Sequence, residues 1–176
     1  GVYEVIISND NGCTASSNVT ITNNDITVID YENYTLLVDE DWSQGMLNVA
    51  GTIIVPTGRK LRIVDTEVNF VSLDATIIVE PGATLILENA TLQGDTCFGT
   101  RWEGIRAYGD GSEIATALNL DNPIDFGNLN TPNHAKVVVN GSTIKHARIG
   151  VALNDGALLF AYNDSYFVDN LYGVYV

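Results

Sequence analysis

The last third of the chain carries the side chains best suited to acid–base chemistry. Three carboxylates, Asp155, Asp164 and Asp169, follow one another closely, and His146 and Arg148 precede them. A pair of carboxylates, or a carboxylate beside an imidazole, can exchange protons with a substrate, which is how many polysaccharides are cleaved. The catalytic candidates to test first are therefore these three aspartates and His146.

The spacing of His146 and Asp169 equals the repeat interval of this part of the chain. If each repeat forms one turn of a stacked fold, His146 lies above Asp169 in the next turn. Such a pair could work as acid and base, but we favour a contact between side chains of adjacent strands. The chain also lacks the clustered Asp-Asp and Gly-His-Gly signatures expected of a pectin hydrolase.

The stretch YGDGSE at residues 108–113 could bind Ca²⁺ through Asp110 and Glu113, although it falls short of a complete calcium-binding loop. We favour a glycine-rich turn that opens a loop, and we expect no other cofactor. Cys13 and Cys97 lie far apart in the sequence, with no CxxC or metal-binding spacing. A disulfide between them is one alternative, and pairing with cysteines beyond this sequence is another.

Three aromatic residues are candidates for ligand binding. Trp102, in the stretch WEGI, could stack on a sugar ring, although such a tryptophan more often fills a corner of a fold. Tyr172 and Tyr175 lie in the final apolar pattern and could form an exposed stripe that contacts carbohydrate or another protein.

Internal sequence repeats predict the strands and turns that position these side chains. GTIIVPTGRKLRI at 51–63 recurs as ATIIVEPGATLIL at 75–87, an interval of 24, and residues 140–153 match 163–176 at an interval of 23. Each unit has a short apolar run, a glycine turn and an alternating strand, without helical periodicity. Repeats of this length predict stacked β-coils, since each coil buries its apolar face only against its neighbours. A segment rich in turn residues predicts a long loop at about 110–134.

The N-terminal residues predict a different element. VYEVII at 2–7 and NVTIT at 18–22 flank Asn11-Gly12, which is a strong hairpin signal. Because two strands alone are marginally stable in water, we expect residues 1–25 to be the last strands of a sandwich, followed by a linker at 26–45. The coils then occupy 46–176. The abrupt start at Gly1 and the apolar end at Val176 suggest a segment of a longer protein, truncated within the coils.

The amino-acid composition excludes some classes of binding partner. Eight Lys and Arg stand against 22 Asp and Glu, a formal net charge of −14, while apolar residues make up 45% of the chain. This balance argues against nucleic acid and anionic membrane surfaces, and no apolar run is long enough for membrane insertion. The few lysines and the many Asn, Thr and Gly residues favour an extracellular location.

Several of these motifs together carry a family resemblance. The repeated TIIV strings, the WEGI stretch, STIKHARIGVAL and FVDNLYGVYV resemble the right-handed parallel β-helix proteins that Bacteroidota secrete, commonly through the type IX secretion system. The resemblance covers roughly residues 42–176. Residues 1–22 are similar to the last two strands of a PKD or Ig-like module, in which the cysteine equivalent to Cys13 usually pairs with an earlier strand.

The resemblance implies an all-β fold, a right-handed parallel β-helix of about five coils. It also implies an extracellular or outer-surface location on a Gram-negative bacterium, as in adhesins, scaffolds and stalks. Our first hypothesis is a non-catalytic, adhesive or structural segment of a secreted surface protein that contacts carbohydrate or a surface protein. The second is a polysaccharide lyase or glycoside hydrolase. The third is secreted cargo bound to the secretion machinery or other outer-membrane proteins.

Overall fold

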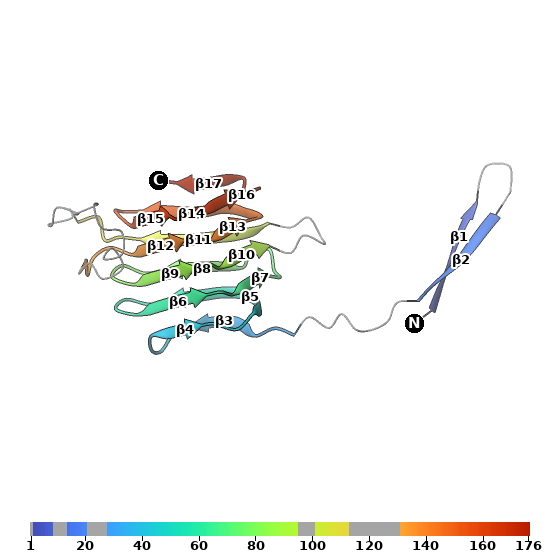
Figure 1. Ribbon diagram of the computed structural model, residues 1–176, viewed down its shortest axis with the longest axis horizontal. Helices are drawn as coiled ribbons and strands as arrows, with labels where there is room; N and C mark the ends of the chain where they lie inside the picture. The colour runs from blue at the N-terminus through green and yellow to red at the C-terminus, as the bar shows by residue number, and fades with distance from the viewer. Residues whose placement is uncertain (1, 9–13, 21–27, 95–100, 113–130) are drawn as a thin grey trace.

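The structure is a computed structural model of the chain, and the residues described are 2–8, 14–20, 28–94, 101–112 and 131–176 (Figure 1). At the N-terminus, β1 (Val2–Ser8) and β2 (Thr14–Thr20) pair antiparallel, with Val2 opposite Thr20 and Ser8 opposite Thr14. The predicted hairpin is therefore confirmed. The Asn11-Gly12 turn and both cysteines lie outside the described residues.

All other described strands pair in parallel. They are β3 (Tyr31–Thr35), β4 (Glu40–Trp42), β5 (Met46–Val55), β6 (Lys60–Val64), β7 (Glu67–Phe70), β8 (Thr76–Val79), β9 (Thr84–Glu88), β10 (Thr91–Gly94), β11 (Trp102–Tyr108), β12 (Lys136–Asn140), β13 (Thr143–Lys145), β14 (Ala147–Asn154), β15 (Leu158–Tyr162), β16 (Tyr166–Val168) and β17 (Tyr172–Tyr175). The described residues form no helix. The predicted all-β class is confirmed.

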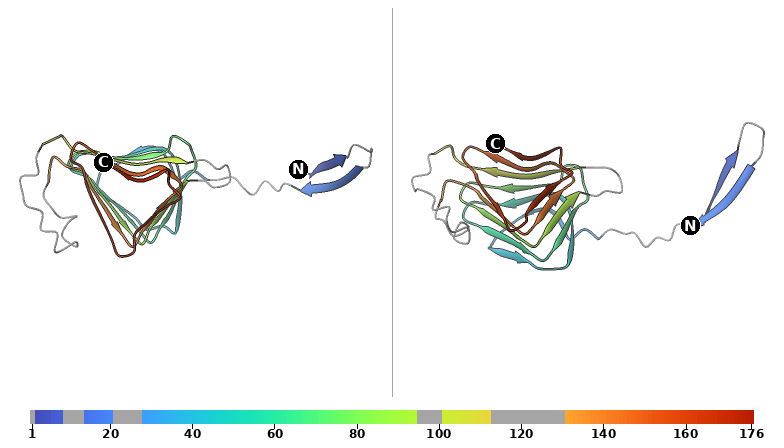
Figure 2. Two further views of the ribbon diagram at one scale, coloured as in Figure 1. Left: turned by 90° about the horizontal axis from the view of Figure 1, so that it is seen from above. Right: turned by 45° about the horizontal axis from the view of Figure 1, so that its top comes forward.

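The parallel strands stack in three ladders, which run along three sides of the stack (Figure 2). Ladder 1 contains β3, the second half of β5, β8, β11, β14 and β17. Ladder 2 contains β4, β6, β9, β12 and β15. Ladder 3 contains the first half of β5, β7, β10, β13 and β16. We call one passage through the three ladders a coil, and this arrangement is consistent with a parallel β-helix.

The sequence repeats define the pairing register. Thr52 pairs with Thr76, and Leu61 pairs with Leu85, as the longer of the two repeat intervals predicts. Ile144 pairs with Phe167, as the shorter interval predicts. Like residues of successive coils therefore lie above one another at the inter-strand spacing of roughly 4.8 Å.

Two boundaries differ in detail from the sequence-based expectation. The coils begin before residue 46, since β3 pairs with β5 and β4 pairs with β6, inside the segment expected to be a linker. A long connection does join β11 to β12, from residue 109 to residue 135. A bridge between Gly109 and His134 closes its base. The connection does not disturb ladder 2, where Lys136 pairs directly with Thr84 of the preceding coil.

The core consists of inward side chains arranged in columns, one residue from each coil. Ladder 2 contributes Leu61, Leu85 and Val137, all fully buried, and ladder 1 contributes Ile53, Ile77, Ile105 and Val151 in the same way. Alternate residues of each strand face inward, which is why short apolar alternations form these strands.

The first coil closes one end of these columns with aromatic rings. Tyr31 stacks on Trp42 with ring centroids 4.3 Å apart and tilts against Tyr34 at 5.0 Å. Glu40 accepts hydrogen bonds from the Trp42 Nε1 at 3.0 Å and from the Tyr34 hydroxyl at 2.6 Å. This cap buries Trp42 to 2% exposure while its polar atom keeps a partner.

Candidate functional site

The three candidate aspartates lie at three different corners of the coils. Asp155 lies between β14 and β15, Asp164 between β15 and β16, and Asp169 between β16 and β17. Each adopts a left-handed backbone conformation, with φ of 52°, 55° and 53°. Aspartate is one of the few residues that tolerates this conformation, so the turns account for all three. The structure does not bring these carboxylates together as a catalytic pair.

His146 and Asp169 do lie next to each other, as the repeat interval predicts. The Nε2 of His146 is 3.9 Å from the Oδ2 of Asp169, and the two residues occupy the same corner in successive coils. His146 also has a positive φ of 55°, so it too forms a turn. The side chain of Asp169 is 71% exposed. The geometry is that of a surface contact between corners, and no second described carboxylate is paired with His146.

Trp102 requires a correction, since it cannot stack on a sugar in this conformation. Its side chain is 1% exposed, and its ring lies parallel to Phe70 with centroids 3.8 Å apart. Its Nε1 donates to the carbonyl oxygen of Lys145 at 3.1 Å. Trp102 therefore fills a corner of the core, which was the alternative interpretation of the WEGI stretch. Gly94, opposite Phe70 in the intervening coil, has no side chain to separate the two rings.

Asp110 belongs to the base of the long connection. Its Oδ1 accepts a hydrogen bond from the Ser112 main-chain N–H at 2.9 Å, and hydrogen bonding by Ser112 keeps the pKa of the carboxyl below its usual value. Glu113, its predicted partner in a calcium site, lies outside the described residues. In the described part of the chain, no group of three or more His, Cys, Asp or Glu side chains is placed to hold a metal ion.

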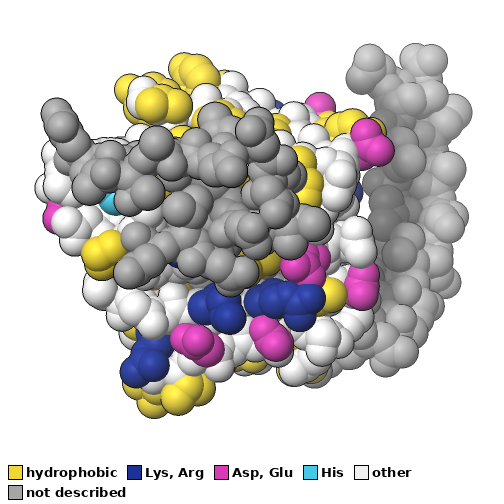
Figure 3. All heavy atoms as spheres, turned by 60° about the vertical axis from the view of Figure 1, so that its left-hand side comes forward, with side chains coloured by type: hydrophobic (Ala, Val, Ile, Leu, Met, Phe, Trp, Pro, Cys, Tyr) yellow, Lys and Arg dark blue, Asp and Glu magenta, His cyan; other side chains and the backbone are white. Residues whose placement is uncertain are grey.

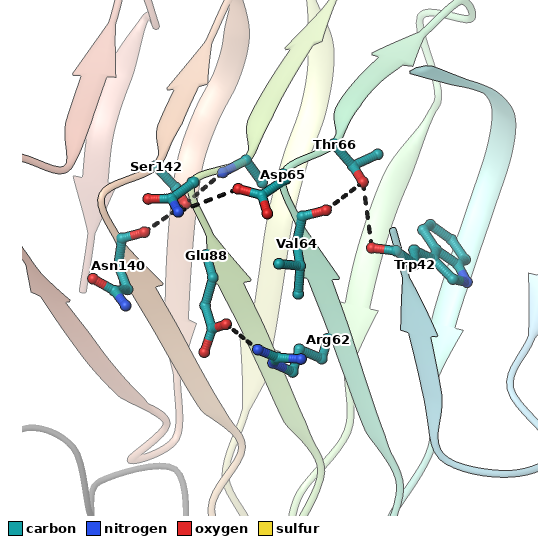
Figure 4. A network of polar contacts seen from close by, with 10 residues as sticks. Trp42, Arg62, Val64, Asp65, Thr66, Glu88, Asn140 and Ser142 are labelled. Carbon is teal, nitrogen blue, oxygen red and sulfur yellow. Dashed lines mark hydrogen bonds and ion pairs between the residues drawn. The ribbon is translucent and has the colours of Figure 1, made fainter. Parts of the chain in front are cut away.

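The corner between ladders 2 and 3 contains a network of polar side chains that links successive coils (Figure 4). The Ser142 hydroxyl accepts from the Ala90 N–H at 3.0 Å and donates to the Asn140 carbonyl at 2.9 Å. Thr66 occupies the equivalent position two coils earlier and donates to the Val64 carbonyl at 2.7 Å. These hydroxyls satisfy main-chain groups that the turn removes from the ladders.

Asparagine side chains form the outer edge of the same corner. Asn89 donates to the Oδ1 of Asp65 at 3.2 Å, and Asn163 donates to the Oδ1 of Asn140 at 2.9 Å. Asn140 and Asn163, which the repeat interval places at the same position, are thus hydrogen-bonded between successive coils. The N-x-S/T triplets that begin at residues 89, 140 and 163 all fall at this corner, so the repeat explains them structurally.

A group of charged and aromatic side chains occupies the outer surface of ladder 1 and its corner with ladder 3. Glu103 accepts from the Arg106 guanidinium at 2.5 Å and from the Arg148 guanidinium at 3.3 Å. Tyr172 and Tyr175, on the next strand of ladder 1, are 57% and 56% exposed, in agreement with the expected stripe. Their role in ligand binding stays a prediction. Sequence reasoning missed the two arginines as a pair, because the long connection separates them in the sequence.

The other cationic group lies on ladder 2, where acidic residues accompany it (Figure 3). Arg62 forms an ion pair with Glu88 of the next coil, and this hydrogen bond raises the pKa of the guanidinium. The main-chain N–H of Lys60 donates to the Oδ1 of Asp39 at 3.0 Å. Burial lowers the pKa of Lys136, and the neighbouring charge of Lys60 adds to this effect. On this face carboxylates therefore lie close to the cations.

Comparison with known proteins assigns the chain to no family. No protein-family model, curated protein or solved structure matches the chain. Among the residues that the structure describes, none belongs to a helix of the length and apolarity needed to cross a bilayer.

Proposed function

We propose that the chain is a non-catalytic segment, adhesive or structural, of a large secreted protein on the outer surface of a Gram-negative bacterium. In this proposal the coils are a right-handed parallel β-helix of about five turns, and β1 and β2 end a PKD or Ig-like module. The sequence resemblance to type IX-secreted proteins of Bacteroidota supports the cellular setting. Carbohydrate or another surface protein is the partner class that we propose.

The observation that carries the non-catalytic proposal is the separation of the candidate carboxylates. Asp155, Asp164 and Asp169 each form the turn of a different corner, where the positive φ accounts for their presence. Glycoside hydrolysis needs two carboxyl groups that flank one bond, roughly 5 to 10 Å apart. The polar side chains between coils are likewise used in hydrogen bonds that hold the turns, as Ser142 and Asn163 do.

The test is an activity screen of the purified chain against acidic and neutral polysaccharides, with release of reducing ends or unsaturated products as the readout. We expect no release above a heat-denatured control. Release that is lost in both His146→Ala and Asp169→Ala would establish the enzyme alternative instead, since those two residues are the described acid–base neighbours. Surface labelling of intact cells tests the location. Co-purification with outer-membrane components would favour the alternative of cargo bound to secretion machinery.

The proposal assigns no cofactor. Calcium binding by Asp110 and Glu113 stays a prediction, and a melting temperature unchanged by EDTA and by added Ca²⁺ would count against it.

A further inference from the structure

The cationic residues of this acidic chain are concentrated in two places. The chain has eight Lys and Arg and a net charge of −14. Four of the eight lie on or beside ladder 2, and the other four lie at ladder 1 and its corner with ladder 3: Arg101, Arg106, Lys145 and Arg148. The second group differs from the first because two of its guanidinium groups share a single carboxylate, that of Glu103.

This sharing leaves hydrogen-bond donors on both arginines. A guanidinium has five N–H donors in a fixed plane, and the contacts with Glu103 use one terminal nitrogen of each side chain. The side chains of Arg106 and Arg148 remain 43% and 63% exposed, while Glu103 is 24% exposed. Glu103 thus fixes two arginines on one face while both still present donors to solvent, and the pair keeps an excess of positive charge.

Two exposed tyrosines of β17 continue this face into the next coil. Tyr172 pairs with Ile149, which directly follows Arg148. Tyr175 pairs with Ala152, which in turn pairs with Arg106. Tyr175 therefore stands two strands from Arg106, roughly 10 Å at the usual strand spacing, and the small side chain of Ala152 lies between them.

We propose that this arginine–tyrosine face binds an anionic glycan through its carboxylate or sulfate groups. A guanidinium matches the planar geometry of a carboxylate and can bond it through two parallel N–H groups. A tyrosine presents an apolar ring face together with a polar hydroxyl, which suits an amphipathic sugar ring. Arg106 on β11, Arg148 on β14 and the tyrosines of β17 follow one another along the stack, so a linear chain laid along it could contact each in turn. This inference rests on the proposed adhesive function and names its ligand class.

The experiment measures binding of the intact chain to polygalacturonate, to dextran sulfate and to neutral dextran by isothermal titration calorimetry at two salt concentrations. We expect binding to one or both anionic polymers, weaker at high salt, and none to dextran. The double variant Arg106→Gln/Arg148→Gln should lower the affinity at least about tenfold, which corresponds to about 1.4 kcal/mol. Tyr172→Ala/Tyr175→Ala should also weaken binding.

The matched control is Arg59→Gln/Lys60→Gln, which removes the same charge from two exposed residues before and at the start of β6. It should leave the affinity within about twofold, provided each variant keeps the wild-type melting temperature. Binding to polygalacturonate alone assigns the site to carboxylates, and binding to dextran sulfate alone assigns it to sulfates. Equal losses in the two charge variants, binding to dextran, or no binding at all would overturn the inference. None of these results involves cleavage, so the non-catalytic proposal would stand or fall separately.

Discussion

Trp102 lies flat against Phe70, with their ring centroids 3.8 Å apart and their planes within 2° of parallel. Phe70 belongs to ladder 3, whereas Trp102 starts a strand of ladder 1, so the stack joins two sides of the coils. The Nε1 of Trp102 is satisfied by the Lys145 carbonyl of ladder 3 at 3.1 Å. Trp102 thereby links β11 of ladder 1 to β7 and β13 of ladder 3.

This stack predicts a large loss of stability on truncation of Trp102. Trp102→Ala should lower the free energy of unfolding by about 3–5 kcal/mol, because it leaves a cavity beside Phe70. Denaturant unfolding followed by circular dichroism provides the measurement. Tyr172→Ala, on an exposed ring, should change the free energy by no more than about 0.5 kcal/mol. Similar losses in the two variants would contradict the assignment of Trp102 to the core.

Alanine substitutions at three glycines distinguish two causes of instability: a positive φ, and a steric clash of the added Cβ. Gly104 has a φ of 97°, and a Cβ there would lie 1.6 Å from the carbonyl oxygen of Ile149. Gly58 has a φ of 74° but open space around it, and Gly45 has open space without a positive φ. We expect alanine to cost about 3 kcal/mol or more at Gly104, about 1–2 kcal/mol at Gly58 and almost nothing at Gly45. Melting temperatures should be lowest for the Gly104 variant and highest for the Gly45 variant. A Gly104 variant as stable as the Gly58 variant would show that the Ile149 carbonyl can move away.

The Ser142 hydroxyl accepts the hydrogen bond of the Ala90 N–H in place of a main-chain carbonyl. Ser142 itself is 1% exposed. Ser142→Ala should therefore destabilise the protein by about 1–3 kcal/mol, since it leaves a buried donor without its acceptor. Ser142→Thr retains the hydroxyl and should recover most of that loss, as Thr66 occupies the equivalent corner position. Urea unfolding midpoints test both variants. Equal loss in the alanine and threonine variants would mean that packing, and not the hydrogen bond, is decisive.

Alkaline pH should weaken the aromatic cap. The hydrogen bond from the Tyr34 hydroxyl to Glu40 raises the pKa of Tyr34 from 10.0 to about 12. Between these values the folded chain retains a proton that the unfolded chain releases, so stability falls as the pH rises through this window and is fully present below it. Thermal melts of the wild type and Tyr34→Phe across this alkaline range provide the test.

In Tyr34→Phe the melting temperature should depend less on pH in this alkaline range. The variant should also be less stable than the wild type at neutral pH, because Glu40 loses a hydrogen-bond donor. Tyr175→Phe, on an exposed ring of β17, serves as the control and should follow the wild type. Identical slopes for all three proteins would show that Tyr34 does not contribute to the pH dependence.

Sequence reasoning was most successful where the repeat interval alone determines the neighbours. The interval of the C-terminal repeat is sufficient to place Phe167 over Ile144 and Asp169 beside His146, because the coils of that region have the same length. Sequence reasoning did not consider Arg106, Glu103 and Arg148 as one group, since the connection between β11 and β12 separates its members in the sequence.

Two further differences have local causes. The stretch at Tyr31–Thr35 has little apolar alternation and does not share the repeated motif, so its sequence indicates at most a short β-like stretch near Tyr34 and does not place it in the first coil. The stack of Trp102 on Phe70 joins two coils, with Gly94 paired to Phe70 in the coil between, and such a relationship becomes visible only when the register between the coils is known.

The parallel ladders also determine how the coils would respond to tension. Their hydrogen bonds point along the stack, so a pull between its two ends loads one coil after another and not all strands together. Each rupture would free about 24 residues, which corresponds to roughly 80 Å of extended chain at roughly 3.4 Å per residue. In single-molecule stretching the coils should therefore lengthen in successive steps, about one for each coil, so that the stack acts as an extensible tether that dissipates load gradually.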